Sequence, residues 1–490
     1  MESFLKQLVQ GKGLLFIIIV GLGGSFQIGC HLTLISSPYP FINSFINSTL
    51  TQRYGEAPRE DTLTLIWATV VAFYSVGGIF GSTSVQFVLN HLGRKNAMIW
   101  NNVLNIVAVA IMILSKAAGS FEMIILSRFL FGVNSGLAGN LHCIYLGESA
   151  PKKIRGTVSV TMATFSAIGK LVGQIAGLSE ILGREDLWHI LLCVPAFFGF
   201  VQMFTLPFFP EAPVYLLIEK GKIEECKKGL QCLWGPGDYK LEIEEMQEEQ
   251  AALKGQCNKS MLELLTDSNI RWQCISLVVL YEAIQFCGIS GISVFAYSIF
   301  QEAGIPEDKI RYVTLGVGAS EILTSITCSI MIDRVGRRVL LWGGFGIMAA
   351  IMVLLTITLQ LKDYDLWVPY TSVCLVFLFV ISYGGGPAGV SVPLSYEMFV
   401  QSYRSAAFMF LGLIIWAGFT VFGFLFPFLL NTMKSFSFLM FSCVCLAASL
   451  YAVFILPETK SKTPLEIAED FRNIRVCGSA IEEKCLETKL

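Results

Sequence analysis

Two sets of charged residues with the same order and spacing occur in the two halves of this 490-residue chain. The first set is Arg94, Glu148, Arg155 and Glu211, and the second set is Arg337, Arg338, Glu397, Arg404 and Glu458. Corresponding members are 243 to 249 residues apart, which indicates an internal duplication. Arginines and carboxylates at helix ends can pair in one conformation and separate in another, so both sets are candidate conformational latches.

The chain lacks the residue patterns of covalent, metal or nucleotide chemistry. No Ser/His/Asp triad or metal-ligand cluster occurs at a workable spacing. Gly169-Lys170 lacks the earlier glycine and the following Ser or Thr of a phosphate-binding loop. A net charge of −2 argues against nucleic acid as a partner. We therefore expect no enzymatic catalysis, no cofactor and no metal.

Six ionisable side chains fall inside long apolar segments, namely His31, Arg128, His142, Lys170, Glu282 and Glu321. A charge at the centre of a membrane helix costs about 2.5–3.5 kcal/mol unless it faces partners or water, so these groups should point inward. Lys170 and Glu321 have opposite signs and fall one in each half, which predicts a buried pair. Separate solvation of each charge by water in a cavity is the alternative.

The composition indicates that these residues are carried by membrane-spanning helices. With 54% hydrophobic and 15% charged residues, the chain cannot cover a water-soluble surface. Apolar runs long enough to cross ~30 Å of hydrocarbon occur at twelve places. They are 14–36, 63–89, 97–114, 123–146, 157–178, 188–208, 272–300, 312–332, 339–360, 369–394, 406–430 and 436–456. The predicted fold is an all-α membrane protein with two parallel six-helix repeats.

The positive charges predict the orientation of the chain in the membrane. Most of the 35 Lys and Arg residues lie on the side of the N-terminus, which places both termini in the cytoplasm. The sequon at Asn47 then lies in the first outer loop and is the expected glycosylation site, whereas the sequon at Asn258 lies inside. None of the 14 cysteines falls in an outer loop, so we expect no structural disulfide.

The predicted organisation has four parts. They are an N-terminal six-helix bundle over 1–208, a cytoplasmic linker over 209–270, a C-terminal six-helix bundle over 271–456 and a cytoplasmic tail over 457–490. Within the linker, Lys222–Leu233 and Leu241–Leu253 have the spacing of short surface helices, although a solvated tether is the alternative. Residues 470–490 are expected to be disordered.

Several stretches resemble one known family over nearly the whole chain. They are the GRK and GRR turns, the two E-x6-R pairs, PEAPVYLL from Pro210, GPAGVSVPLSYE from Gly386 and PETKSKT from Pro457. These stretches resemble the sugar porters of the major facilitator superfamily, and in particular class II of the facilitative glucose transporters, solute carrier family 2. The resemblance implies two six-helix bundles that rock about a central solute site.

The resemblance also implies which residues contact the solute. Gln285 and Ser290 fall in the sugar-contact stretch of the seventh span, and Trp416 matches a stacking aromatic of the eleventh. Lys170 and Glu321 align with cavity-facing positions. Arg128 matches an arginine with a structural role, and His142 and Glu282 are expected to be satisfied by helix packing.

The chain departs from the pattern of this family at several positions. Ala163 and Val392 replace a glutamine and a tryptophan that contact sugar in the family, and Val214 replaces an arginine of the gating network. His31 stands where facilitative members carry asparagine and proton-coupled relatives carry aspartate. Because several sugar hydrogen-bond donors are missing, the resemblance leaves the solute itself open.

The resemblance favours a facilitative uniporter for a hexose such as glucose or fructose, or for a related small polar solute. The alternatives are a proton-coupled symporter acting through His31 or Glu321, and a transport-inactive membrane sensor or interaction protein with the same fold. The expected partners are the small-molecule solute and the lipid bilayer. We expect a monomeric transport unit in the plasma membrane.

Overall fold

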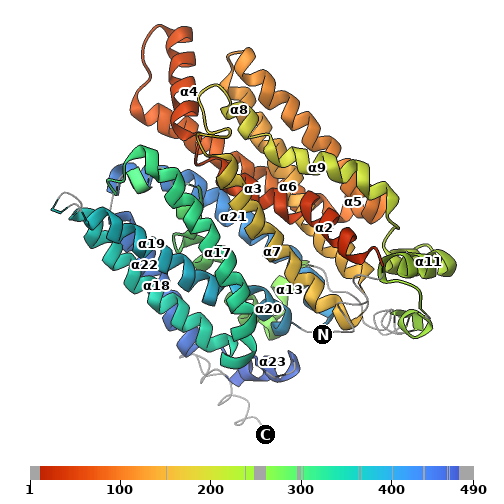
Figure 1. The fold of residues 1–490 in the computed structure, drawn as a ribbon. Helices are drawn as coiled ribbons and strands as arrows, with labels where there is room; N and C mark the ends of the chain where they lie inside the picture. The colour runs from red at the N-terminus through yellow and green to blue at the C-terminus, as the bar shows by residue number, and fades with distance from the viewer. Residues whose placement is uncertain are drawn as a thin grey trace.

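The computed structural model describes residues 11–150, 152–237, 239–244, 246–247, 261–294, 299–301, 303–361, 364–365, 367–399, 401–433, 436–460, 462 and 464–473. Within these ranges every regular element is a helix. The helices form two groups that lie side by side, with the N-terminal helices in red to yellow and the C-terminal helices in green to blue (Figure 1). We refer to these groups as the N-terminal half and the C-terminal half.

The N-terminal half contains α2 (Gly13–Gly23), α3 (Ser25–Leu34), α4 (Tyr39–Tyr54), α5 (Glu60–Ala117), α6 (Phe121–Ser149), α7 (Lys152–Ala176), α8 (Trp188–Leu191) and α9 (Val194–Thr205). The expected first span is broken at Gly24, where the backbone N–H of Ser25 donates to Nδ1 of His142 at 3.2 Å. The expected second and third spans meet in α5 at Gly93, whose φ of 78° favours glycine.

The segment between the halves contains η1 (Leu206–Phe208), α10 (Pro213–Ile218), α11 (Ile223–Trp234), α13 (Met261–Thr266) and η2 (Ser268–Ile270). The first predicted linker helix is therefore confirmed as α11, while the second is described only through residue 247. Trp234 anchors α11 to the N-terminal half by donating from Nε1 to the carbonyl of Ser149 at 2.8 Å. Burial raises the pKa of the Cys226 thiol to about 11, so this group remains protonated and serves packing.

The C-terminal half contains α14 (Arg271–Phe286), α15 (Ile289–Val294), α17 (Glu307–Val335), α18 (Arg337–Gln360), α19 (Val368–Tyr383), the π-helical turn η3 (Gly384–Ala388), α20 (Gly389–Met398), α21 (Gln401–Met433) and α22 (Ser437–Phe454). A further helix, α23 (Pro464–Asn473), follows in the tail. Four residues at its end, 470–473, were expected to be disordered and are helical instead, while 474–490 lie outside the described residues.

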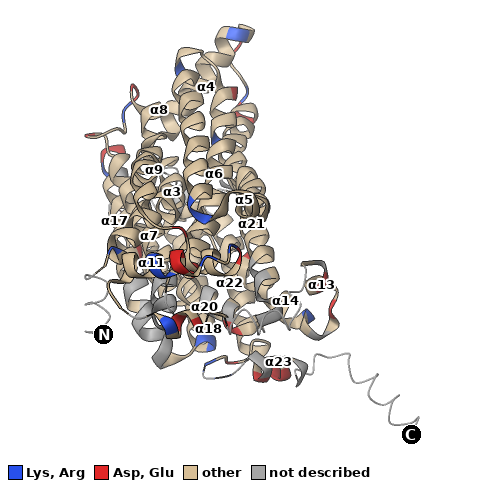
Figure 2. Ribbon diagram, turned by 90° about the vertical axis from the view of Figure 1, so that its right-hand side faces the viewer, with Lys and Arg blue, Asp and Glu red and all other residues tan. Residues whose placement is uncertain are grey.

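Charge and hydropathy divide the molecule along its helices. Among the described residues, eight helical segments are long and apolar enough to cross a membrane, and the longest, α5, has 58 residues. Figure 2 shows most of the Lys, Arg, Asp and Glu residues near the two ends of the helices, with uncharged ribbon between them. We call the end that holds the Gly93 and Gly336 turns the basic end, and the opposite end the α4 end.

Glycines let α5 and α6 approach until their backbones touch, and we call this contact the α5–α6 seam. A Cβ atom on Gly132 would lie 1.9 Å from the carbonyl oxygen of Tyr74, and one on Gly77 would lie 2.0 Å from that of Phe129. A Cβ atom on Gly81 or on Gly136 would likewise collide with backbone atoms of the opposite helix. Small residues at such positions allow close packing of membrane helices without a hydrophobic driving force between them.

Among the helix pairs that join the halves, two position the central residues. The first pair is α5 with α21, where a Cβ on Gly78 would lie 2.3 Å from the ring of Trp416. The second pair is α7 with α17, where the amide oxygen of Gln174 would lie 1.8 Å from a Cβ on Gly318. The Gln174–Gly318 contact lies toward the α4 end, whereas Gly78 and Trp416 lie near the middle of their helical runs.

Candidate functional site

The first charged set forms a compact cluster at the basic end of the N-terminal half. The turn at Gly93 places Arg94 at the start of a new helical run, where its Nη2 lies 2.9 Å from Oε1 of Glu148. Its Nε lies 2.8 Å from the other Glu148 oxygen, and its Nη2 lies 2.8 Å from Glu219. The guanidinium also stacks over the ring of Tyr215, 4.4 Å from the centroid. Arg94 therefore ties α5 and α6 to the segment between the halves.

Glu211 supports the same cluster from the backbone side. Its Oε1 accepts hydrogen bonds from the backbone N–H groups of Lys95 at 2.8 Å and Ala212 at 3.1 Å. The Lys95 ammonium donates to the carbonyl of Phe209 at 3.1 Å. A carboxylate at this position satisfies an N–H group that the first turn of a helix leaves free and suits the positive end of the helix dipole. We call Arg94, Glu148, Glu211 and Glu219 the N-terminal latch.

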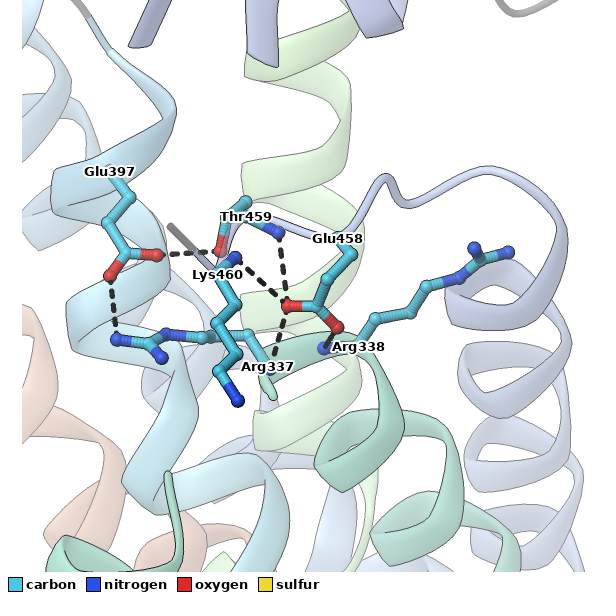
Figure 3. A network of polar contacts seen from close by, with 6 residues as sticks. All are labelled: Arg337, Arg338, Glu397, Glu458, Thr459 and Lys460. Atoms are coloured by element: carbon cyan, nitrogen blue, oxygen red, sulfur yellow. Dashed lines mark hydrogen bonds and ion pairs between the residues drawn. The ribbon is translucent and has the colours of Figure 1, made fainter. Parts of the chain in front are cut away.

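The second charged set forms a related cluster at the basic end of the C-terminal half (Figure 3). Nη2 of Arg337 donates to Oε1 of Glu397 at 3.1 Å, and the hydroxyl of Thr459 donates to the other Glu397 oxygen at 2.6 Å. Glu458 accepts from the backbone N–H groups of Arg337 at 2.9 Å and Arg338 at 3.1 Å. We call Arg337, Glu397, Glu458 and Thr459 the C-terminal latch.

Glu458 also organises the chain that follows α22. Its Oε1 accepts from the backbone N–H groups of Thr459 and Lys460, both at 3.1 Å. The guanidinium of Arg338 points away from this cluster (Figure 3) and donates from Nε to the carbonyl of Ala452 at 3.2 Å and from Nη2 to the carbonyl of Val453. Its side chain thus satisfies carbonyls at the end of α22, while its backbone N–H takes part in the latch.

The arginine–glutamate pair of each latch lies within one half. Arg94 and Glu148 come from α5 and α6, and Arg337 and Glu397 come from α18 and α20. The side chains of Arg155, Arg404 and Val392, and the whole of Asn258, lie outside the described part of the structure. The structure therefore describes the side chains of seven of the nine residues in the two charged sets.

One ion pair joins the two halves where the sequence predicted it. Nζ of Lys170 on α7 contacts Oε1 of Glu321 on α17. Each of these side chains is 15% exposed, which places the pair largely away from solvent. Toward the α4 end, the hydroxyl of Tyr312 on α17 donates to Oε1 of Glu180 at 2.6 Å. The helix α7 and the residues that follow it thus make two polar links to α17 of the other half.

The predicted solute-contact residues lie together at the junction of α14, α15 and α21. The hydroxyl of Ser290 donates to Oε1 of Gln285 at 3.1 Å, and Nε2 of Gln285 donates to the carbonyl of Ile415 at 3.4 Å. The next residue, Trp416, faces Tyr74 of the N-terminal half, with ring centroids 5.8 Å apart. These three predicted residues are 3–8% exposed. Polar groups and an aromatic face are therefore available where the halves meet.

A small cavity adjoins this cluster. Its polar lining consists of His31, Tyr74, Ser75 and Arg128 from the N-terminal half and Ser290 from the C-terminal half.

His142 lies elsewhere and is satisfied as expected, with its Nδ1 2.7 Å from the hydroxyl of Ser25.

Sequence reasoning missed three residues of the site. Glu219 and Tyr215 contact Arg94, but they belong to the segment between the halves and have no evident copy in the second half. Thr459 contacts Glu397 and directly follows Glu458. The repeated Pro-Glu dipeptide that precedes Thr459 could have pointed to it, whereas the contacts of Tyr215 and Glu219 depend on how the segment folds back.

Comparison with known proteins gives the relationships of this chain. The family model described as "Sugar (and other) transporter" matches residues 16–471. The chain is 40% identical over 471 residues to human solute carrier family 2, facilitated glucose transporter member 11, covering 96% of this chain and 95% of the relative. It is also 40% identical to member 9 of this family from Mus musculus, over 93% of this chain and 84% of the relative. It is likewise 40% identical to member 5 from Ovis aries, over 93% of this chain and 91% of the relative.

Solved structures show the same fold. The inward-open conformation of the xylose transporter XylE from E. coli aligns with a TM-score of 0.76 at 20% identity, over 93% of this chain and 99% of that one. A crystal structure of a D-xylose-proton symporter aligns with a TM-score of 0.72 at 19% identity, over 91% and 99%. At this identity the likeness establishes only that the chain has the fold of these proteins.

Proposed function

We propose, from the premise that this chain belongs to the sugar transporter family and within it to the facilitated glucose transporters of solute carrier family 2, that it is a facilitative uniporter. The proposed solute is a hexose such as glucose or fructose, or a related small polar molecule. The observation that carries this proposal is the polar cluster of Gln285, Ser290 and Trp416 at the contact between the halves. A solute bound there touches both halves and can be released when they rock apart.

The proposed topology has twelve spans. Counting α5 as two spans, broken at Gly93, and treating α2 with α3, α14 with α15 and α19 with α20 as single interrupted spans gives six spans in each half. The 58 residues of α5 would measure about 87 Å as one straight helix, far more than one bilayer crossing requires. We propose the domain boundaries 1–208, 209–270, 271–456 and 457–490 on this basis.

The proposed orientation places the basic end in the cytoplasm, in keeping with the positive-inside rule. The α4 end then faces outward, and the links Lys170–Glu321 and Glu180–Tyr312 lie on the outer side of the central cluster. Contacts between the halves on this side support an arrangement closed to the outside. In the alternating-access cycle these links would have to break for the solute to enter from outside.

Two further proposals concern the cellular setting. Asn47 is exposed on α4 at the end that we propose to be extracellular, which supports its glycosylation. We also propose the plasma membrane as the location and a monomer as the transport unit.

Uptake into proteoliposomes tests the function directly. Purified full-length protein should take up radiolabelled glucose or fructose with saturable kinetics, and the solute should reach equal concentrations on both sides. An imposed pH gradient should leave that end point unchanged. Accumulation driven by the gradient would favour a proton-coupled symporter, and absence of saturable uptake across a hexose panel would contradict a hexose uniporter.

The Gln285→Leu variant tests the proposed solute site. Loss of one buried hydrogen bond to the solute should raise the KM about tenfold, because about 1.4 kcal/mol corresponds to a factor of ten. Gln86→Leu is a matched control, since Gln86 bonds to Asn90 on exposed α5 surface away from the cluster. Equal KM values for wild type and Gln285→Leu on a transported solute would remove Gln285 from the site.

The proposed gating role of the Lys170–Glu321 pair calls for a double-mutant cycle. Lys170→Met and Glu321→Gln should each lower transport and thermal stability, because each leaves a partner charge in a poorly hydrated position. The double variant should recover part of the loss, with a coupling of about 1–3 kcal/mol. Simple additivity of the two single changes would show that the pair carries no coupling.

A further inference from the structure

Arg128 on α6 is a buried cation with no protein counter-charge in the described structure. Its side chain belongs to the fully buried group, with the residue 2% exposed. Its Nε and Nη1 atoms have no hydrogen-bond partner. The nearest favourable group is the ring of Tyr74, whose centroid lies 4.5 Å from the guanidinium carbon. Arginine keeps its proton in proteins, so this position holds a permanent positive charge.

A second unsatisfied group lies beside Arg128. His31 on α3 is 0% exposed, and neither of its ring nitrogens has a hydrogen-bond partner among the residues that the structure describes. Its ring packs against Phe131 with centroids 4.6 Å apart and against Tyr74 with centroids 5.6 Å apart. Tyr74 is thus shared by both groups, with His31 against its ring and the guanidinium of Arg128 over that ring.

Both groups line the small cavity that the two halves enclose. We call it the Arg128 cavity, and its other polar linings are Ser75 and Ser290. Phe419 and Phe422 of α21 cover it from the C-terminal half. Because the lining comes from both halves, the cavity exists in this form only when the halves meet between the middle of the helices and the α4 end.

We propose that the Arg128 cavity is a binding site for a small monovalent anion. An isolated charge in an apolar interior costs several kcal/mol, and protein structures place a paired or hydrogen-bonded group beside it. The cavity supplies donors from Arg128, from the ring N–H of His31 and from the hydroxyl of Ser75, with no described carboxylate in its lining. Such a lining recognises a negative charge and disfavours a cation.

The same chemistry can come from two sources. One is an inorganic anion such as chloride, taken from the solvent as the halves close. The other is the carboxylate of a small organic solute that enters between the halves. In both cases the anion offsets the charge of Arg128 when the outer contact forms, so occupancy stabilises the closed arrangement.

Thermal unfolding of the purified full-length protein in detergent distinguishes these sources. Sodium chloride or sodium acetate is titrated at constant ionic strength against the salt of a bulky sulfonate that cannot enter a small cavity. Binding should raise the Tm saturably by about 2 °C or more. A rise with chloride supports the inorganic source, a rise with acetate alone supports the carboxylate source, and a rise with both supports a site open to either. No rise with either anion overturns the proposal.

Two variants tie the response to the cavity. Arg128→Gln removes the charge and should abolish the rise in Tm. His31→Asp places a carboxylate beside Arg128 as an internal counter-charge and should also abolish the rise, in a protein that still has its arginine. Retention of the full response in either folded variant overturns the proposal, so a failure of Arg128→Gln to fold leaves His31→Asp as the deciding measurement.

Arg53→Gln provides the control for non-specific anion effects. Arg53 pairs with Glu122 near the α4 end, its side chain is 39% exposed, and it does not line the Arg128 cavity. The anion response of this variant should equal that of the wild type. Loss of the response in Arg53→Gln would place the anion effect on exposed arginines and overturn the assignment to the cavity.

Discussion

The N-terminal latch and the C-terminal latch occupy matching places in the duplicated chain, yet they hold their halves together in different ways. Arg94 contacts two carboxylates, Glu148 and Glu219, and the second of these comes from the segment between the halves. The C-terminal latch is instead centred on a hydrogen-bond acceptor, because the Glu458 carboxylate accepts hydrogen bonds from four backbone N–H groups. Duplication has therefore preserved the positions of the charges, while the contacts around them have diverged.

This difference predicts which residue of each latch is most sensitive to substitution. An ion-pair cluster depends on its cation, because removal of that cation leaves carboxylates facing one another. A cluster built on backbone hydrogen bonds depends on its acceptor, because removal of that acceptor frees N–H groups at a helix start. The following predictions test this assignment in order of decreasing effect.

The largest effect is expected at Arg94. Arg94→Met should lower the free energy of unfolding by about 2–4 kcal/mol, since Glu148 and Glu219 then lose their shared partner in a partly buried site. Arg337→Met should cost less, because Glu397 keeps the hydroxyl of Thr459. Thermal or denaturant unfolding of both variants in detergent measures the difference. A greater loss in Arg337→Met would reverse the comparison.

A smaller effect, with the opposite asymmetry, is expected for the capping carboxylates. Glu458→Ala should cost about 2 kcal/mol and Glu211→Ala about 1 kcal/mol, because the first frees four N–H groups and the second frees two. The same unfolding assay measures both variants. Equal losses would show that the number of capped N–H groups does not set the strength of the two latches.

The smallest effect is expected for Glu219, whose side chain is 45% exposed. The coupling between Arg94→Met and Glu219→Gln in a double-mutant cycle should be under about 1 kcal/mol, as for solvent-screened pairs. The coupling between Arg94→Met and Glu148→Gln should be larger, because Glu148 is only 22% exposed. Equal couplings would show that Glu219 contributes as much to the N-terminal latch as Glu148 does.

Two kinds of contact could be predicted from the sequence. The first are contacts within the duplicated sets of charged residues, and the second are contacts that offset the free-energy cost of a charge in an apolar helix. The repeated spacing pointed to charge clusters that include Arg94, Glu148, Arg337 and Glu397. Within these clusters the ion pairs Arg94–Glu148 and Arg337–Glu397 form. The cost of a lone charge in an apolar helix pointed to Lys170 with Glu321, and this pair forms as well. In each case a physical penalty or an internal copy limited the choice of partner.

Other features could not be predicted because they depend on tertiary placement. Arg128 was expected to have a structural role, and only the packed helices show that it has no counter-charge among the described residues. The break at Gly24 depends on a hydrogen bond to His142, which is more than a hundred residues away in the chain. The contact of Glu219 with Arg94 requires α10 to fold back under α5, a path that no local pattern specifies.

The α5–α6 seam has a consequence for inherited variation. At Gly132 or Gly77 even one added methyl group would collide with the backbone of the opposite helix. Because α5 and α6 are consecutive in the chain, their contact can form during membrane insertion, before the C-terminal half has been synthesised. A missense change at these glycines should therefore be recognised by cellular quality control and reduce the amount of protein at its destination, while the molecules that escape retain their ordinary affinity for solute.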